Sequence, residues 1–167
     1  MIQDVETKEL KVIKDDRGFL MEMLRNDDKI FQKFGQVYMT FCKYGVAKAW
    51  HYHKLQDDYF IALQGKTLVG LYDARKKSKT FGQIAKFILA APEEKLARRS
   101  IGEGGGHIVL KIPKGVYHGF AALTKNGSKV LNVPTKTYNY KKPDEYRLVW
   151  NAKEIPFNWP KSVKIGG

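Results

Sequence analysis

The sequence lacks the features that mark several large classes of protein. It has one cysteine, Cys42, in 167 residues, which excludes an internal disulfide and a cysteine-based metal site. Its longest apolar runs, such as residues 87–91, fall far short of the ~20 residues that a membrane-spanning helix needs. The amino-terminal residues carry acids and no apolar segment, so we expect no signal peptide. These absences predict a cytoplasmic protein with no membrane partner.

Acidic side chains are also few beside the basic ones. The chain has 17 aspartates and glutamates against 30 lysines and arginines, which gives a formal net charge of +13. Such an excess attracts anions, whether nucleic acid, acidic lipid or phosphorylated metabolites. The lysines are spread along the whole chain, with no basic tail and no recognition-helix pattern. We therefore expect a solvated lysine-rich surface, with nucleic acid not expected as a partner.

Strand signals, in contrast, are plentiful. Hydrophobic residues make up 43% of the chain and aromatic residues 13%, which suits a β-rich core. Short β-branched and aromatic segments recur between turn residues such as Asn126-Gly127. The segments expected to form strands are 37–41, 47–52, 59–63, 66–72, 84–89, 107–112, 117–121 and 129–133. Their number and spacing predict an all-β sandwich or barrel, in one domain over residues 1–167.

Helix signals are weaker and fall in three peripheral places. Residues 27–34 could form a short helix, with Asn26 or Asp27 as its cap and an apolar face. Residues 92–99 could form a second. Residues 143–160 mix aromatics with prolines, so we expect a coil with a short helix that packs against the barrel. The prediction is therefore a β-barrel with short peripheral helices.

Three of the four histidines lie in two motifs that are spaced for strands. His51 and His53 are two residues apart, and Asp58 follows after a short turn, while His118 comes three residues after a Pro-x-Gly turn. Residues i and i+2 of a strand share a face, so His51 and His53 should point the same way. If the sheet closes, all four side chains can converge on one inward-facing site.

This spacing resembles the two signature motifs of the cupin superfamily of jelly-roll barrels, in which the matching residues often bind a divalent metal. Three imidazoles and a carboxylate suit Fe, Mn, Ni or Zn. One alternative is therefore a metal-binding cupin, either an oxygenase or a metal-dependent isomerase, with His51, His53, Asp58 and His118 as ligands. The other alternative leaves these histidines without a metal.

A second resemblance covers roughly residues 12–160. Its segments fall in one order along the chain: D-D-R-G-F-L-M-E at 15–22, K-A-W-H-Y at 48–52, residues 73–82, I-P-K-G-V-Y-H-G-F at 112–120, P-T-K-T-Y at 134–138 and V-W-N at 149–151. This order resembles the dTDP-4-dehydrorhamnose 3,5-epimerase family of the cupin superfamily. The resemblance implies a cupin double-stranded β-helix, or jelly roll, that acts as a homodimer on a nucleotide-linked 4-keto-6-deoxy sugar without a cofactor.

The resemblance also implies roles for individual residues. His51 would be the base that removes a proton next to the C4 ketone, because a neutral histidine has a pKa near working pH. Asp58 and Tyr138 are the other catalytic candidates. The candidates for substrate binding are Arg17, Phe19, Glu22, Lys48, His53, His118 and Asn132, of which Arg17 suits a pyrophosphate through its fork of donors.

Several positions depart from the family pattern. Lys48 stands where the family usually has an arginine, and His53 where it has a glutamine. A lysine of the family pattern aligns near Asp58, which reverses the charge there. The tyrosine that acts as general acid falls near Asn132, and Ala152 replaces the aspartate that pairs with the base. His51 therefore lacks its usual partner unless Asp57 or Asp58 supplies one. Three hypotheses stay open: an epimerase or ketoisomerase, a metal cupin, and a non-catalytic cupin that binds nucleotide sugars.

Overall fold

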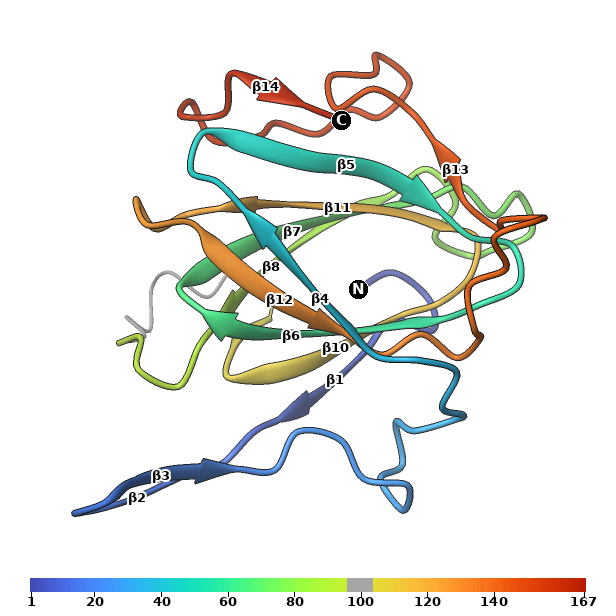
Figure 1. Ribbon diagram of the computed structural model, residues 1–167. Helices are drawn as coiled ribbons and strands as arrows, with labels where there is room; N and C mark the ends of the chain where they lie inside the picture. The colour runs from blue at the N-terminus through green and yellow to red at the C-terminus, as the bar shows by residue number, and fades with distance from the viewer. Residues whose placement is uncertain (96–103) are drawn as a thin grey trace.

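Two β-sheets face each other and form the body of the protein (Figure 1). The computed structural model describes residues 1–95 and 104–167. The five-stranded sheet has the order β1 (Glu6–Glu9), β10 (Ile108–Ile112), β6 (Asp58–Gln64), β12 (Ser128–Asn132) and β4 (Tyr38–Cys42). The seven-stranded sheet has the order β13 (Tyr146–Arg147), β5 (Val46–Tyr52), β11 (Val116–Ala122), β7 (Lys66–Asp73), β8 (Ile84–Ala90) and β9 (Gly105–Gly106), with β14 (Ile165–Gly166) parallel to β5.

A separate hairpin of β2 (Val12–Asp15) and β3 (Gly18–Met21) projects from this body (Figure 1). All eight predicted strands are confirmed to within one or two residues. The prediction misses β1, the projecting hairpin and the two-residue strands β9, β13 and β14. These strands are short, and the two-residue ones form only where a longer strand offers them a free edge, so no local sequence period marks them.

Apolar side chains cover both faces of the central strands. Between the sheets lies a core that includes Phe60, Leu71, Phe87 and Phe120, all at most 4% exposed. Along β6 the first five residues are all buried, so this strand is apolar on both sides and does not alternate. A strand that is covered on both faces has a continuous run of apolar residues in its sequence.

The carboxyl-terminal segment covers the outer face of the seven-stranded sheet. Trp50 of β5 packs there against Phe157 and Trp159, with ring centroids 5.2 and 5.1 Å apart. Because neighbouring residues of a strand point to opposite faces, burial of Trp50 on the outside turns His51 toward the space between the sheets. The packing of this segment therefore orients the first histidine motif.

The structure confirms the all-β prediction and corrects two of its details. In residues 1–95 and 104–167 the ladders join into two facing sheets and do not close into one ring. The predicted peripheral helices are wrong, because the described part of the chain contains no helix. Residues 27–30 form turns, and residues 92–95 form a turn and a bend, while 96–99 lie outside the described residues. The segment 143–160 contains β13 and turns instead of a helix.

Tertiary contacts explain why residues 27–34 do not form a helix. The Tyr59 hydroxyl donates to the carbonyl of Ile30 and accepts from the amide of Gln32. The Asp28 carboxylate accepts from the amide of Arg25 and from Lys8 Nζ. These partners satisfy backbone groups that a helix would pair internally, so the weak helix propensity is overridden. The described part of the chain also has no helix that is long and apolar enough to cross a membrane.

Candidate active site

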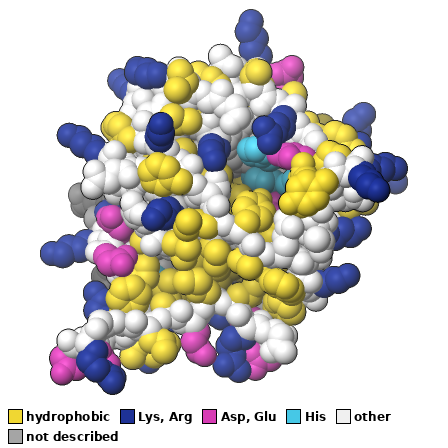
Figure 2. Space-filling model, in the orientation of Figure 1, with side chains coloured by type: hydrophobic (Ala, Val, Ile, Leu, Met, Phe, Trp, Pro, Cys, Tyr) yellow, Lys and Arg dark blue, Asp and Glu magenta, His cyan; other side chains and the backbone are white. Residues whose placement is uncertain are grey.

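A cavity of about 610 Å³ opens between the inner faces of the two sheets. Figure 2 shows a hollow with histidines at its base and with basic, acidic and apolar side chains around its rim. Strands β4, β5, β11 and β12 contribute its walls, and residues 138–147 contribute its mouth. Most of the predicted site residues meet here, because the inner faces of both sheets converge on this space.

The three motif histidines come together at the base of this cavity. His51 of β5 and His118 of β11 are direct cross-strand partners, and their ring centroids lie 6.0 Å apart. His53 follows the end of β5, with its ring 5.4 Å from that of His118. Burial lowers the pKa of His118 well below its usual value, and the neighbouring imidazoles His53 and His51 lower it further. His118 is therefore neutral at pH 7.

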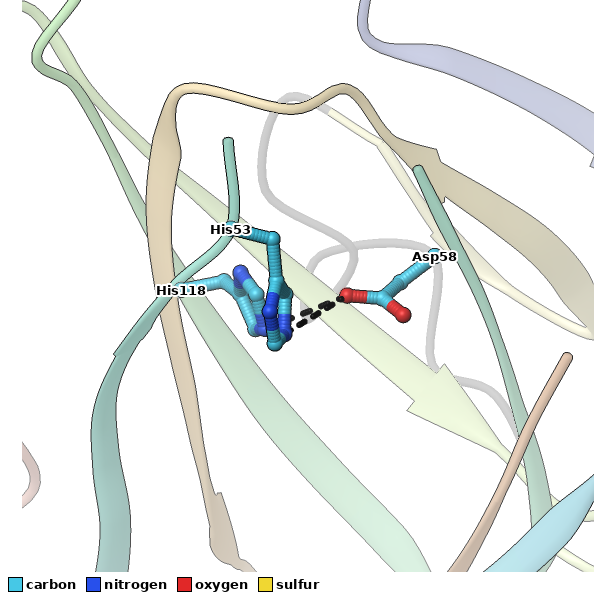
Figure 3. Close-up of side chains that lie close together, drawn as sticks. All are labelled: His53, Asp58 and His118. Carbon is cyan, nitrogen blue, oxygen red and sulfur yellow. Dashed lines mark ion pairs between the residues drawn. The ribbon is translucent and has the colours of Figure 1, made fainter. Parts of the chain in front are cut away.

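Asp58 reaches the same place from the opposite sheet, at the start of β6. Its Oδ2 lies 3.4 Å from His53 Nε2 and 3.5 Å from His118 Nε2 (Figure 3). Its Oδ1 accepts hydrogen bonds from Asn132 and Gln56, at 2.9 and 3.1 Å. Burial raises the pKa of Asp58, although His53 and the hydrogen bonds from Asn132 and Gln56 oppose this shift.

Neither aspartate replaces the partner that His51 lacks. Asp58 faces the other two imidazoles, and Asp57 accepts a hydrogen bond from the amide of Lys114. Instead, Glu145 Oε1 lies 3.2 Å from His51 Nδ1. Burial lowers the pKa of His51, as does the charge of Arg147, while Glu145 opposes both.

Ala152, which stands where the resemblance expects the partner of the base, lies away from His51. Ala152 packs in a cluster with Trp50, on the outer face of β5 and thus opposite His51. Glu145 reaches the imidazole because β13 pairs with β5, with Arg147 opposite His51 in the register. No local motif signals this contact, since it depends on the pairing of a two-residue strand.

A second missed residue is Tyr38, which enters the cavity from β4. It pairs in register with Asn132 of β12, and Asn132 Nδ2 donates to the Tyr38 hydroxyl oxygen at 2.9 Å. Burial and the nearby charge of Asp58 raise the pKa of Tyr38 to about 12. The phenol is therefore protonated at neutral pH. It lies beside Asn132, near which the sequence resemblance placed the family's acid.

The remaining cavity candidates lie higher on its walls. Lys48 lines the cavity and donates from Nζ to Thr40 Oγ1 at 2.7 Å. Tyr138 lies at the mouth, where its ring meets that of Tyr140 edge-on at 5.0 Å. Both aromatic rings are at least partly exposed, and Tyr140 is 90% exposed.

Three predicted binding residues lie outside this cavity. Arg17 and Phe19 belong to the projecting hairpin, and Glu22 follows it directly. The Arg17 side chain is 86% exposed and pairs with Asp15 at 2.6 Å. Within one chain these residues do not line the cavity.

Comparison with known proteins places this geometry in a family. The family model described as dTDP-4-dehydrorhamnose 3,5-epimerase matches residues 1–166. The chain belongs to this epimerase family. The resemblance seen in the sequence is thereby confirmed, as is the isomerase class of enzyme that it implies.

Relatives of the epimerase family match nearly the whole chain. The spore coat polysaccharide biosynthesis protein SpsL of Bacillus subtilis (strain 168) is 37% identical over 159 residues, which cover 95% of this chain and 97% of that protein. A probable low-salt glycan biosynthesis epimerase of Haloferax volcanii is 33% identical over 164 residues, or 97% of each chain.

Solved structures of the epimerase family show the same fold. A dTDP sugar isomerase from Desulfovibrio desulfuricans G20 superposes with a TM-score of 0.82 at 30% identity, covering 95% of this chain and 92% of that one. The dTDP-4-dehydrorhamnose 3,5-epimerase of Bacillus anthracis, solved with TDP and pyrophosphate bound, gives a TM-score of 0.80 at 26% identity, covering 98% and 89%. The cupin-type jelly roll predicted from the motifs is therefore confirmed.

Proposed function

We propose that this protein epimerises a nucleotide-linked 4-keto-6-deoxy sugar by removing a proton from the carbon next to the ketone. The observation that carries this proposal is the contact between His51 and Glu145 in the wall of the cavity. Through this contact His51 has a carboxylate partner, although Ala152 stands where the family usually has the partner of the base. Proton transfer of this kind uses side chains alone, so we propose no cofactor for it.

The environment of His51 supports its role as the base. The Glu145 carboxylate accepts the hydrogen on Nδ1, so the lone pair of the neutral ring is on Nε2. Burial and Arg147 lower the pKa of His51, which keeps the imidazole neutral and able to accept a proton at pH 7. Once protonated, the imidazolium would be stabilised by Glu145 at 3.2 Å.

We further propose that Tyr38 returns the proton. His51 removes the proton at C3 or C5, the C–H electron pair forms an enolate with the C4 ketone, and the Tyr38 hydroxyl then protonates the opposite face of that carbon. Asn132 donates to the Tyr38 oxygen, so the hydroxyl hydrogen is free for the substrate. Lys48 is a cation on the same wall, which suits stabilisation of the enolate oxygen. Solvent then reprotonates the phenolate and takes up the proton held by His51.

A homodimer would complete the nucleotide site in this proposal. Strand β4 is an edge of the five-stranded sheet, and its Met39 and Phe41 are 53% and 42% exposed. Figure 2 shows an apolar band below the hollow. An unpaired edge strand with exposed apolar side chains is suited to association with a second copy. The projecting hairpin could then bring Arg17 and Phe19 to the cavity of the partner.

The relatives also suggest a biological setting. SpsL and the Haloferax volcanii protein carry names that refer to spore coat polysaccharide and to glycan biosynthesis. We propose that this protein likewise supplies a deoxysugar for a cell-surface polysaccharide. The single, buried Cys42 suits the reducing cytoplasm, where we place the reaction.

Solvent exchange tests the proposed reaction. The protein is incubated in D₂O with dTDP-4-keto-6-deoxyglucose and, as a matched control, with the same sugar nucleotide reduced to the alcohol at C4. We expect deuterium at C3 or C5 of the ketone and none in the alcohol, because only the ketone acidifies these positions. Absence of deuterium from the ketone, together with intact binding of the nucleotide sugar, would leave the non-catalytic binding hypothesis.

The proposed acid has its own signature in this assay. Tyr38→Phe removes the proton donor and leaves the base in place. Inversion of the carbon should therefore fall by about 100-fold, while exchange through His51 continues on the original face. Equal losses of exchange and inversion would show that Tyr38 does not act as the separate acid.

A further inference from the structure

At the base of the cavity, two imidazoles direct the same ring nitrogen at one carboxylate oxygen. His53 Nε2 and His118 Nε2 lie 3.4 and 3.5 Å from Asp58 Oδ2 (Figure 3). One ligand atom from each of the three side chains lies within 4.8 Å of the other two. His118 is 4% exposed and Asp58 is 1% exposed, so the cluster is largely shielded from water.

Backbone carbonyls determine the tautomers of both rings. The Nδ1 of His53 faces the carbonyl oxygen of Asp144, and the Nδ1 of His118 lies 3.2 Å from the carbonyl oxygen of Val116. A carbonyl oxygen only accepts hydrogen bonds, so each Nδ1 carries the hydrogen and each neutral ring has a lone pair at Nε2. Two lone pairs and a carboxylate oxygen therefore face one another, an arrangement that either a shared proton or a metal ion between them would stabilise.

The distances suit a metal ion better than a shared proton. A hydrogen bond between an N–H and a carboxylate oxygen spans about 2.7–3.2 Å, which is shorter than either contact of Asp58 Oδ2. Two ligand atoms bound to one tetrahedral metal at about 2.1 Å lie about 3.4 Å apart. The 3.4 and 3.5 Å separations match this second geometry.

Hydrogen bonds orient all three side chains in the way that is usual for metal ligands. Histidines that bind metals usually donate their other N–H to a carbonyl or carboxylate, as His53 and His118 do. Asp58 is oriented by Asn132 and Gln56 through Oδ1, which leaves Oδ2 toward the imidazoles. His51 is not part of the group, and its Nδ1 faces Glu145. The ligand set inferred here therefore has three of the four residues that the sequence suggested.

We propose that His53, Asp58 and His118 bind a divalent first-row transition-metal ion. Two imidazole nitrogens and one carboxylate oxygen suit Zn²⁺, Fe²⁺, Mn²⁺ or Ni²⁺, and further coordination positions would face the cavity. The site goes beyond the proposed function and does not depend on it, since it stands whether or not His51 removes a proton.

Cobalt titration tests the site without an activity assay. Tag-free, full-length protein is stripped with a chelator and titrated with Co²⁺, and the visible absorption of the bound ion is followed. We expect one Co²⁺ per chain, displaced by Zn²⁺. His53→Gln and Asp58→Asn should each weaken binding by at least about 100-fold, because each removes one of three ligands.

His107→Gln is the matched control for the ligand variants. His107 is the one histidine outside the three motif positions, and its Nδ1 faces the Ala90 carbonyl at 3.0 Å. This variant should bind Co²⁺ within about threefold of the wild type, since distant sites act independently.

X-ray absorption on the cobalt-loaded wild type keeps the proposal testable if a ligand variant fails to fold. It should show two imidazoles at bond lengths of about 2.0–2.1 Å. The proposal is overturned if the wild type takes up no stoichiometric metal, or if uptake persists unchanged in His53→Gln and Asp58→Asn. Either result would leave the three residues as an ion pair that shares a proton.

Discussion

Asp58 and Asp73 are both buried carboxylates, at 1% and 0% exposure, yet their surroundings are opposite. Asp73, at the end of β7, accepts hydrogen bonds from Arg75 Nε, Ser78 Oγ and Thr80 Oγ1 at 2.8, 2.6 and 2.6 Å. Burial alone would raise the pKa of Asp73, but these hydrogen bonds hold the pKa of that carboxyl well below its usual range.

Fewer hydrogen-bond donors surround the Asp58 carboxylate, and its other neighbours are two imidazole rings. Its Oδ2 faces two imidazole lone pairs, and burial raises the pKa of this carboxyl. A buried charge stabilises a fold only when donors surround it. Asp73 thus stabilises the fold through a charge that donors satisfy, whereas the role proposed for Asp58 is to bind a cation together with His53 and His118.

Removal of the Asp73 charge should have the largest effect on stability. Asp73→Asn leaves the partly buried Arg75 guanidinium with only the exposed Asp4 as its anion and weakens the hydrogen bonds from Ser78 and Thr80. Breaking a buried pair in this way costs about 3 kcal/mol, which urea unfolding at pH 7 would measure as a lower midpoint at constant slope.

Asp58→Asn is the matched substitution at the other carboxylate. In metal-free protein it should change the free energy of unfolding by less than about 1 kcal/mol, because the amide replaces a charge that few donors satisfy. If Asp58→Asn lowered the free energy of unfolding as much as Asp73→Asn does, both carboxylates would stabilise the fold and the proposed difference between them would be wrong.

The next largest effect should appear in turnover. Glu145→Gln removes the charge that stabilises protonated His51, so we expect kcat to fall by about 100-fold with KM nearly unchanged. Steady-state epimerisation of the 4-keto sugar nucleotide measures this split. Glu154→Gln, on the exposed surface, is the matched control and should behave as wild type. A rise in KM alone would instead assign Glu145 to substrate binding.

Lower pH should reduce the difference in the free energy of unfolding between the wild type and Asp73→Asn. The folded pKa of Asp73 is depressed, so its contribution to stability is complete above the unfolded pKa of about 3.9 and is lost as pH falls toward the folded value. At pH 3 the difference in unfolding free energy should therefore be smaller than at pH 7 by about 1 kcal/mol. An unchanged difference would show that the Asp73 pKa is not depressed.

The sequence predicted the parts of this molecule that depend on local pattern. The strands follow from short apolar and aromatic segments between turns, and the i, i+2 rule placed His51 and His53 at one site. The rest depends on contacts between distant segments. The Tyr59 hydroxyl prevents a helix at residues 27–34 because it forms hydrogen bonds with the backbone of that segment. Glu145 contacts His51 only because β13 pairs with β5. No property of residues 143–147 alone marks that pairing.

Solvent deuterium incorporation in a pair of variants tests directly whether His51 removes the proton next to the ketone. His51→Gln and Asp73→Asn are compared on the 4-keto sugar nucleotide at a temperature where circular dichroism shows both folded. We expect Asp73→Asn to exchange within about threefold of the wild type, whereas His51→Gln should show only the background rate. Wild-type exchange by His51→Gln would contradict the claim that this histidine, at the wall of the cavity, removes the proton next to the ketone.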